Sequence, residues 1–335
     1  MNPDENRWLL PDGFEELWPD EAWRLELMRR GFLDLCRARG YALAAPPLVE
    51  HVESLSAGVG RDLDAATFKL VDPESGKLLG LRADMTPQVA RMDAHLLREE
   101  GATRLCYAGP VLRARPDAFG GPRELLQAGA ELYGDARPEA DCEVIALMTE
   151  TLRASGIAEF SLDLGHVGIY RALIAGTSLR AEAERALFDA LRRKSRPEII
   201  ALAPTLDLPV PQREALLSLP TLNGDYRVIE TARPILAACG PAVREALDNL
   251  LAVAERIRQK LPRVPLFLDL AELRGYAYHT GAVFAAYVPG QGQAIAQGGR
   301  YDDIGRAFGR ARAATGFSAD LRQWLRIAPA AGGGG

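Results

Sequence analysis

Four stretches of the chain place polar residues inside apolar surroundings, as a small-molecule site does. In "LLQAGAELYG" (125–134), Gln127, Gly129 and Glu131 alternate at period two, so they share one face of a predicted strand. The other three stretches supply arginines at predicted strand ends, an acid beside a hydroxyl, and a neighbouring tyrosine and histidine. These residues are Arg82, Asp84, Thr86, Arg113, Arg274, Tyr278 and His279.

Such residue types suit a zwitterion. An arginine binds a carboxylate through two parallel hydrogen bonds. An aspartate or glutamate with a glutamine accepts an ammonium, and a further acid, tyrosine or histidine pairs with the nitrogens of an imidazole. The residues alone therefore indicate an amino-acid pocket without saying which amino acid. Each stretch also has a structural interpretation, in which Arg–carboxylate pairs tie loops down. A fifth stretch, "AIAQGGRYDDI", contains Gly298, Gly299 and Arg300, and the same two interpretations, a ligand pocket or loop fixation, apply to it.

Strands surround the predicted site, and a helical block interrupts them. The pattern predicts a helix over 20–39, ended by Gly40, and a second helix from "DMTPQVA", with Thr86 as its N-cap. It also predicts a hairpin around "PESGK" and a helical region from about 167 to 262. Strands are expected at 104–113, 124–134, "EFSLDLG", "VPLFLDL", "TGAVFAAYV" and "AIAQGG", and a last helix from "GFSADLRQWL". This order predicts an α+β fold built on an antiparallel sheet.

Composition narrows the class of protein. The 335 residues carry a formal net charge of −5, which gives no support for a nucleic-acid surface. The four cysteines lack zinc spacing, so we expect no metal, and buried, reduced thiols in a cytoplasmic protein. Glycine-rich nucleotide-binding loops are absent from the sequence, and we expect no cofactor. No signal peptide or membrane span is expected either.

Together, these stretches resemble the catalytic core of histidyl-tRNA synthetase, a class II synthetase, from about residue 8 to 328. "GYALAAPPLVE" resembles motif 1, "VLRARPDAFGGPRELLQAGAELYG" resembles motif 2, and "LRGYAYHTGAVF" and "QGGRYDDI" resemble the histidine-specific elements. The resemblance implies one class II core over 1–328 with a helical insertion at about 167–262. It also implies a homodimer through motif 1, roughly 31–50. We expect a disordered glycine-rich tail at 329–335 and no anticodon-binding domain.

The resemblance also assigns roles in a histidine pocket. Arg274 matches the arginine that would hold the carboxylate of histidine. Tyr278 matches the first tyrosine of its motif, whereas His279 replaces the second, which normally faces the imidazole. The candidate histidine-binding residues are Asp84, Thr86, Arg113, Gln127, Glu131, Arg274, Tyr278 and His279.

The nucleotide side departs from the synthetase pattern. Arg113 stands where an arginine would meet the α-phosphate, but Arg115 replaces a glutamate. Gly121 replaces the loop arginine, and Leu125 replaces the aromatic residue that would stack on adenine. In motif 3, Asp320 replaces a glycine and Gln323 replaces an arginine. Arg322 is one residue away from that arginine position, so on a helix its side chain should point about 100° away from the expected direction. Loss of phosphate-binding cations removes the electrostatic stabilisation on which phosphoryl chemistry depends.

These losses resemble a group of synthetase paralogues, the regulatory subunits of ATP phosphoribosyltransferase. The resemblance implies a non-catalytic protein that acts in the first step of histidine biosynthesis. It would activate a short-form catalytic subunit and take part in feedback by L-histidine. Two alternatives remain: a synthetase-like enzyme that still activates an amino acid, and a tRNA-binding or kinase-linked sensor module.

Overall fold

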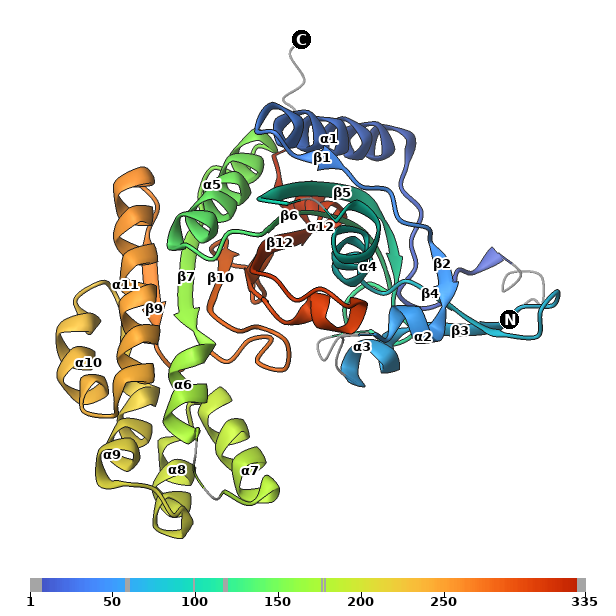
Figure 1. The fold of residues 1–335 in the computed structure, drawn as a ribbon. Coiled ribbons are helices and arrows are strands. Elements are labelled where there is room, and N and C mark those ends of the chain that lie inside the picture. Colours follow the sequence, from blue (N-terminus) through green and yellow to red (C-terminus); the bar gives the residue numbers. More distant parts are fainter. Residues whose placement is uncertain are drawn as a thin grey trace, which may run out of the picture.

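A large sheet organises the chain. The computed structural model describes residues 8–57, 61–98, 100–116, 120–175, 177 and 179–329. Among them, nine strands form a sheet in the order β1-β5-β6-β12-β11-β10-β7-β9-β8 (Figure 1). Neighbours are antiparallel except β1–β5 and β7–β9. The strands are β1 (Ala42–Leu43), β5 (Thr103–Leu112), β6 (Glu124–Tyr133), β7 (Ser161–His166), β8 (Asn223–Gly224), β9 (Leu266–Asp269), β10 (Ala282–Tyr287), β11 (Ala296–Arg300) and β12 (Ala314–Asp320).

A small second sheet lies beside the large one. It has the order β2-β4-β3, with β2 (Val49–His51), β3 (Phe68–Val71) and β4 (Leu78–Leu81). Arg82 follows β4 and joins the two sheets, because its Nε donates to the Pro110 carbonyl on β5 at 2.8 Å and its Nη1 to the Pro46 carbonyl at 2.6 Å. Arg82 is buried by these contacts, so the structural interpretation holds for this residue.

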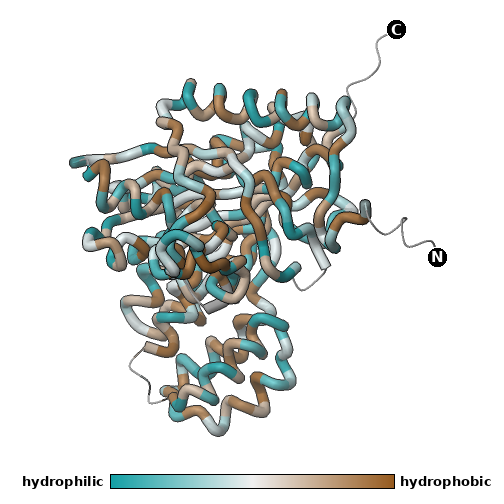
Figure 2. The backbone as a smooth tube through the Cα atoms, turned by 90° about the vertical axis from the view of Figure 1, so that its right-hand side faces the viewer, coloured by the Kyte–Doolittle hydropathy of each residue, from teal (hydrophilic) through white to brown (hydrophobic). Residues whose placement is uncertain are grey.

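Helices flank the sheets. They are α1 (Pro19–Ala38), α2 (Val52–Leu55), α3 (Arg61–Ala66), α4 (Thr86–Arg91), α5 (Pro138–Ala154), α6 (Val167–Ile174), α7 (Ala181–Arg192), α8 (Arg196–Leu202), α9 (Val210–Ser218), α10 (Val228–Ala237), α11 (Pro241–Lys260) and α12 (Leu321–Ile327). The segment α6–α11 sits between β7 and β9, and in Figure 1 α7–α10 gather away from the β3–β4 hairpin. Apolar and polar positions alternate along these helices (Figure 2), as expected of helices with one buried stripe. No helix of the described ranges is long and apolar enough to cross a bilayer.

The two faces of the large sheet differ because side chains alternate along each strand. One cross-strand row reads Ala130, Phe317, Gly298, Phe284 and Leu164. Its apolar members belong to the main hydrophobic core, together with buried residues of α1, α5 and α11. The next row, on the opposite face, reads Leu105, Glu131, Gly316, Gly299 and Val283. We call this opposite face the site face, because the predicted Gln127 and Glu131 lie on it.

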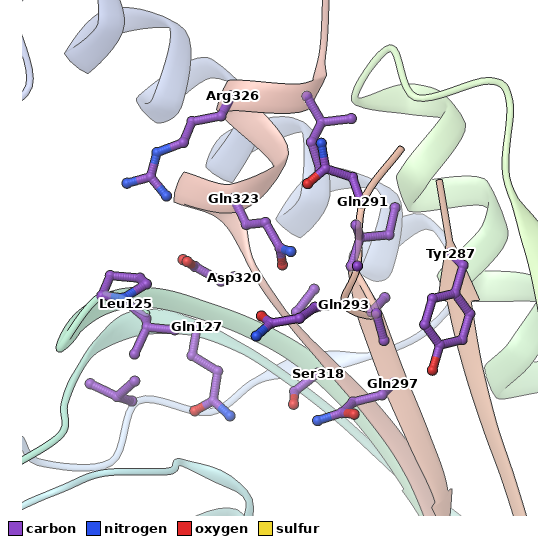
Figure 3. A pocket seen from close by; sticks show the side chains of 18 of the residues that line it. Leu125, Gln127, Tyr287, Gln291, Gln293, Gln297, Ser318, Asp320, Gln323 and Arg326 are labelled. Atoms are coloured by element: carbon purple, nitrogen blue, oxygen red, sulfur yellow. The ribbon is translucent and has the colours of Figure 1, made fainter. Parts of the chain in front are cut away.

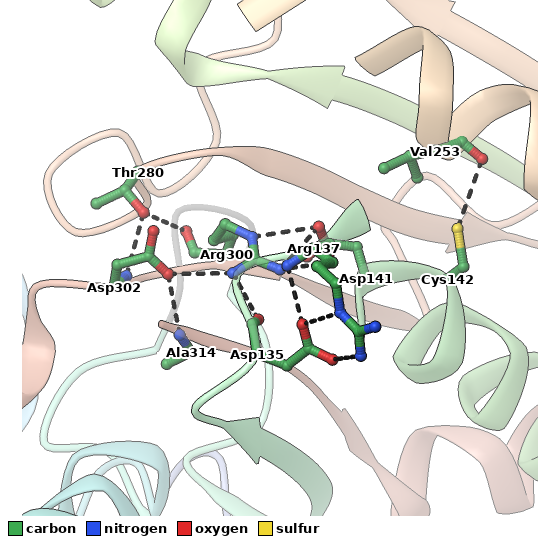
Figure 4. A network of polar contacts seen from close by, with 9 residues as sticks. All are labelled: Asp135, Arg137, Asp141, Cys142, Val253, Thr280, Arg300, Asp302 and Ala314. Atoms are coloured by element: carbon green, nitrogen blue, oxygen red, sulfur yellow. Dashed lines mark hydrogen bonds and ion pairs between the residues drawn. The ribbon is translucent and has the colours of Figure 1, made fainter. Parts of the chain in front are cut away.

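A buried ion pair joins the sheet to α5 on the core face. The Arg300 guanidinium donates to Asp141 Oδ2 at 3.0 and 3.2 Å, and also to the carbonyls of Asp135 and Arg137 (Figure 4). Asp302 accepts from Arg300 and from the Ala314 backbone, at the start of β12. Arg300 directly follows Gly299 in β11, and side chains alternate along a strand, so Arg300 lies on the core face and not on the site face. Its role is therefore to tie parts of the fold together, as the structural interpretation of this stretch had it.

Most predicted elements are confirmed, with two corrections. The β3–β4 hairpin, the β5–β6 pair and the first helix lie where the sequence placed them. The stretch "GFSAD", however, is the end of β12 and not the start of a helix; the helix begins at Leu321. Thr86 is not an N-cap, because its hydroxyl bonds to Tyr107 and Glu131 of the large sheet. Asp84 Oδ1 instead accepts from the Thr86 N–H at 2.9 Å. The tail beyond Pro329 lies outside the described residues.

Asp141→Ala should lower the free energy of unfolding by about 3–5 kcal/mol, because it leaves a buried Arg300 without its carboxylate. Equilibrium denaturation measures this. The matched control is Asp303→Ala, which removes an exposed pair with Arg306 and should cost about 1 kcal/mol or less. Equal losses in the two variants would show that the buried pair is not what holds α5 to the sheet.

Candidate functional site

A cavity of about 800 Å³ opens on the site face, over the ends of β6, β12 and β11 (Figure 3). The β10–β11 connection and the first turns of α12 complete its walls. Its polar lining consists of Arg113, Gln127, Arg274, Tyr287, Gln291, Gln293, Gln297, Ser318, Asp320, Gln323 and Arg326. Three of the eight predicted site residues, Arg113, Gln127 and Arg274, therefore face one cavity.

Gln127 connects the cavity to the segment before α4. Its Oε1 accepts from the Met85 N–H at 2.8 Å, and its Nε2 donates to Asp84 Oδ1 at 2.8 Å. Because both ends of the amide are bonded, the orientation of Gln127 is fixed and Asp84 is held beside it. Asp84 is not itself a lining residue of the cavity, but its carboxylate lies against Gln127, which is.

Glu131 lies two same-face rows further along β6 than Gln127, with Gly129 between them, and is 1% exposed. Its Oε1 accepts from Tyr107 at 2.9 Å and from Thr86 at 3.2 Å, while its Oε2 accepts from Tyr301. Burial raises the pKa of the Glu131 carboxyl to about 8, although the hydroxyl donors oppose that shift. Glu131 is thus enclosed by its own neighbours and does not line the cavity.

Arg274 stands on the far rim of the cavity, after β9. Its Nη2 donates to Glu272 Oε2 at 3.0 Å and to the Tyr287 hydroxyl at 2.7 Å. Its side chain remains 25% exposed. The guanidinium is therefore held in place at the cavity edge, where a ligand carboxylate could reach its remaining N–H groups.

Tyr278 and His279 close the inner end of this region. The two rings lie 4.2 Å apart between centroids, and the Tyr278 ring also approaches Tyr301 at 5.6 Å. Tyr278 is 37% exposed, whereas His279 beneath it is 5% exposed. Burial lowers the pKa of His279 to about 4, so its imidazole is neutral near pH 7.

The opposite end of the cavity carries the residues that depart from the synthetase pattern. Leu125, Asp320 and Gln323 all line it. Asp320 accepts from the backbone N–H groups of Leu126 and Arg322, at 3.1 and 3.0 Å, and so caps α12. Arg322 points away from the cavity, as predicted, and pairs with Glu124 at 3.1 Å. Arg326 lines the cavity but pairs with Glu15.

Several lining residues were not predicted from the sequence. They are Tyr287, Gln291, Gln293, Gln297, Ser318 and Arg326. Ser318 was missed because β12 was predicted as a helix; Gly316, Ser318 and Asp320 alternate at period two, and that signal was present. The glutamines of the β10–β11 connection carry no such signal, because a polar loop is ordinarily solvated.

Comparison with known proteins agrees with this geometry. The histidyl-tRNA synthetase family matches residues 13–324. Over 324 residues, the chain is 56% identical to the ATP phosphoribosyltransferase regulatory subunit of Thioalkalivibrio sulfidiphilus, covering 97% of this chain and 82% of that protein. The chain belongs to the histidyl-tRNA synthetase family and, within it, to the ATP phosphoribosyltransferase regulatory subunits.

Solved structures of this family share the fold. A protein from Bacillus halodurans, described as an ATP phosphoribosyltransferase regulatory subunit/histidyl-tRNA synthetase, superposes with a TM-score of 0.86 at 29% identity, over 96% of this chain and 84% of that one. A histidine–tRNA ligase subunit from Alicyclobacillus acidocaldarius gives 0.78 at 27% identity, over 95% and 96%. The class II synthetase-like fold predicted from the sequence is confirmed.

Glu131 should make the stability of this regulatory-subunit fold depend on pH. Its pKa rises from 4.5 to about 8 on folding. The stability gained by keeping the carboxyl protonated is therefore fully present below about pH 4.5 and is lost as the pH rises through about 8. Glu131→Gln cannot titrate, so its free energy of unfolding should vary less over this window in denaturant titrations.

Glu26→Gln is the control for that series. Glu26 is a half-buried carboxylate on α1 whose pKa is lowered to about 2 by hydrogen bonds from Arg29 and Arg30. Its contribution should change only below about pH 4.5, so the trend at higher pH should match that of the unmodified protein. A Glu131→Gln profile parallel to the unmodified one would mean that Glu131 titrates normally in the fold.

Proposed function

We propose that this chain, a member of the ATP phosphoribosyltransferase regulatory subunits, acts on the catalytic subunit of the first step of L-histidine biosynthesis. It binds the short-form catalytic subunit in the cytoplasm, activates it and contributes to feedback by histidine. One observation carries the proposal beyond family membership. The amino-acid side of the cavity keeps Gln127 and Arg274, with the Asp84 carboxylate bonded to Gln127, whereas the nucleotide side presents Asp320 and Gln323.

The ligand of the proposed sensor site is L-histidine. Arg274 would bind its carboxylate, because a guanidinium offers paired N–H donors to a carboxylate. Asp84, held by Gln127, would accept the ammonium group. Glu131 with Thr86, and His279 with Tyr278, would surround the ring, and Arg113 completes the predicted set. The support is spatial: these residues converge from β4–α4, β5, β6 and the segment after β9 onto one region of the site face.

The same cavity argues against adenylate formation. Amino-acid activation needs cations on the triphosphate as negative charge develops. Here Arg322 is held by Glu124 and Arg326 by Glu15, while the Asp320 carboxylate lines the wall. We therefore expect no histidine-dependent exchange of labelled pyrophosphate into ATP above the blank. An authentic histidyl-tRNA synthetase, assayed in parallel, is the positive control, and exchange by this chain would favour the residual-enzyme alternative.

The proposed assembly includes a homodimer through the motif 1 segment, roughly 31–50. Leu27 on α1 and Leu43 on β1 are both 61% exposed, and Leu48 and Val49 follow at 37% and 38%. The outer edge of β1 has no neighbouring strand in the sheet of the described chain. An apolar strip beside an open strand edge is suited to a second copy of the same chain.

The regulatory role is tested with the purified short-form catalytic subunit. Mixed with this chain, that subunit should co-elute in a complex whose mass contains two copies of the chain or a multiple, and should form phosphoribosyl-ATP faster. Histidine should inhibit the mixture. In Arg274→Ala the complex and the activation should persist, while the histidine concentration for half-inhibition rises about 30-fold or more, since a desolvated charge pair is worth about 2–5 kcal/mol.

Arg306→Ala is the matched control, because Arg306 forms an exposed pair with Asp303 outside the cavity. Its inhibition curve should match that of the unmodified chain. If the chain neither co-elutes with the catalytic subunit nor changes its rate, the regulatory role is wrong. If Arg274→Ala leaves half-inhibition unchanged while activation persists, histidine acts at another site.

A further inference from the structure

Contacts with the helical insertion, α6–α11, hold the connection between β9 and β10. The connection passes beside α6 (Figure 1), where Arg171 Nη2 donates to the carbonyls of Tyr276 and His279, both at 2.9 Å. The same guanidinium lies 4.6 Å from the centroid of the Tyr276 ring. One exposed side chain of the insertion is therefore bonded to two points of the turn that carries Arg274.

The Tyr276 ring packs between two helices of the insertion. Its centroid lies 5.4 Å from that of Tyr170 on α6 and 5.3 Å from that of Phe188 on α7. Tyr170 is 1% exposed and belongs to the main hydrophobic core, so Tyr276 reaches the interior of the helical block. Aromatic pairs at these distances attract one another beyond the effect of the area that they bury. The turn therefore depends on α6 and α7 for its apolar contacts.

Further contacts attach both ends of the connection to the insertion. Lys194, between α7 and α8, forms an ion pair with Asp269 Oδ2 at 2.6 Å. At the other end, the Val167 N–H at the start of α6 donates to the Gly281 carbonyl at 3.1 Å. The segment 269–281 is therefore bonded to helices of the insertion at its start, in its middle and at its end.

The turn in this segment presents one side chain to the insertion and another to the cavity. Tyr276 packs against α6 and α7, whereas Arg274, two residues earlier, lines the cavity. Hydrogen bonds inside the turn make it one unit, because the Gly275 carbonyl accepts from the N–H groups of Tyr278 and His279, at 2.9 and 2.8 Å. A displacement of the turn on the insertion side would therefore also move the backbone of Arg274.

We infer that the helical insertion positions the arginine of the amino-acid site, with Arg171 as the positioning residue. This rests on the proposed function, in which Arg274 binds the carboxylate of histidine. Arg171 does not line the cavity, so it acts on the ligand only through the turn. A ligand that binds Arg274 in this position of the turn also favours the contacts that hold the turn there. Histidine binding and the order of α6 and α7 are therefore linked by an equal factor in both directions.

A double-mutant cycle, measured by calorimetric titration of the full chain with L-histidine, tests the positioning role. Arg171→Ala should weaken histidine binding about tenfold, because only a fraction of the molecules then holds the turn in the position that binds. In the Arg274→Ala background the same change should weaken binding about twofold or less, since the group that Arg171 positions is already gone. Equal losses in the two backgrounds would overturn the inference, because a general loss of structure acts independently of Arg274.

Further variants separate the contacts of the turn. Tyr276→Phe keeps the ring between α6 and α7 and should bind histidine like the unmodified chain, whereas Tyr276→Ala removes the ring and should bind about as weakly as Arg171→Ala. Arg192→Ala is the matched control, because Arg192 is exposed and pairs with Asp189 of its own helix. Thermal unfolding verifies that each variant is folded. Unchanged affinity in Tyr276→Ala, or a loss in Arg192→Ala equal to that in Arg171→Ala, would contradict the inference.

Hydrogen exchange followed by mass spectrometry tests the reverse direction of the linkage. Histidine should slow amide exchange in peptides from α6 and α7, because the bound ligand stabilises the turn on which their contacts depend. The effect should persist in Arg192→Ala and be smaller in Arg171→Ala. If histidine binds the unmodified chain and leaves exchange in α6 and α7 unchanged, the insertion is not linked to the site and the inference fails.

These outcomes separate the inference from the proposed function. A chain that does not bind histidine overturns the inference, but activation of the catalytic subunit by that chain would leave the regulatory role standing. A chain that binds histidine with the expected coupling between Arg171 and Arg274, but does not activate the catalytic subunit, would retain the inference and lose the function.

Discussion

The buried pair of Arg300 and Asp141 is the constraint on which the rest of the sheet depends. Both side chains are almost fully removed from water, and burial of an unpaired charge would cost several kcal/mol. The same guanidinium bonds to the Asp135 and Arg137 carbonyls, so it fixes the β6–α5 connection against β11. Because Arg300 directly follows Gly299, the hydrogen bonds that hold Arg300 on the core face also fix the position of Gly299 on the site face.

The net positive charge of the cavity depends on whether its arginines are paired with carboxylates and not on how many arginines line it. Arg274 pairs with Glu272 and Arg326 with Glu15, and each pair leaves little net positive charge. Arg113 is the lining cation without an acidic partner among the described residues. A triphosphate would need several uncompensated cations. An amino-acid carboxylate needs one guanidinium with N–H groups to spare, as Arg274 has beside its pair with Glu272. The electrostatics of the cavity therefore follow the losses seen in the sequence.

Period two was the most informative signal in the sequence, and its use was incomplete. It placed Gln127 and Glu131 on one face, and the register of β6 and β12 confirms that placement. Applied to "GFSAD", it would have found β12, but glycine, serine and alanine have low strand propensity, and the strand forms because it is paired on both sides. Arg300 shows the converse. Its residue type suggested that it binds a ligand, but the alternation of side chains along β11 places it on the core face.

The sequence did not predict how completely each candidate residue is enclosed by its neighbours. Composition and spacing brought the candidate residues to one region, but the enclosure of Glu131 and His279 depends on how Tyr107, Tyr301 and Tyr278 pack around them. Those contacts join residues far apart in the chain, and their geometry follows from tertiary packing. The candidate set therefore divides into an open group beside the cavity and a closed group behind it, a division that residue types alone do not contain.

This division has a thermodynamic consequence for a sensor. A ligand that reaches Glu131 and His279 would have to part the side chains packed around them, so its apparent affinity would be its intrinsic affinity reduced by the population of an opened state. A partner that favours the open arrangement would remove that reduction. Linkage then requires the reverse: ligand in the inner compartment would favour the same arrangement at the partner surface by an equal factor. A closed compartment can thus report an amino acid to another protein without any chemistry at the site, provided that the ligand and the partner act on the same Tyr278–His279 segment.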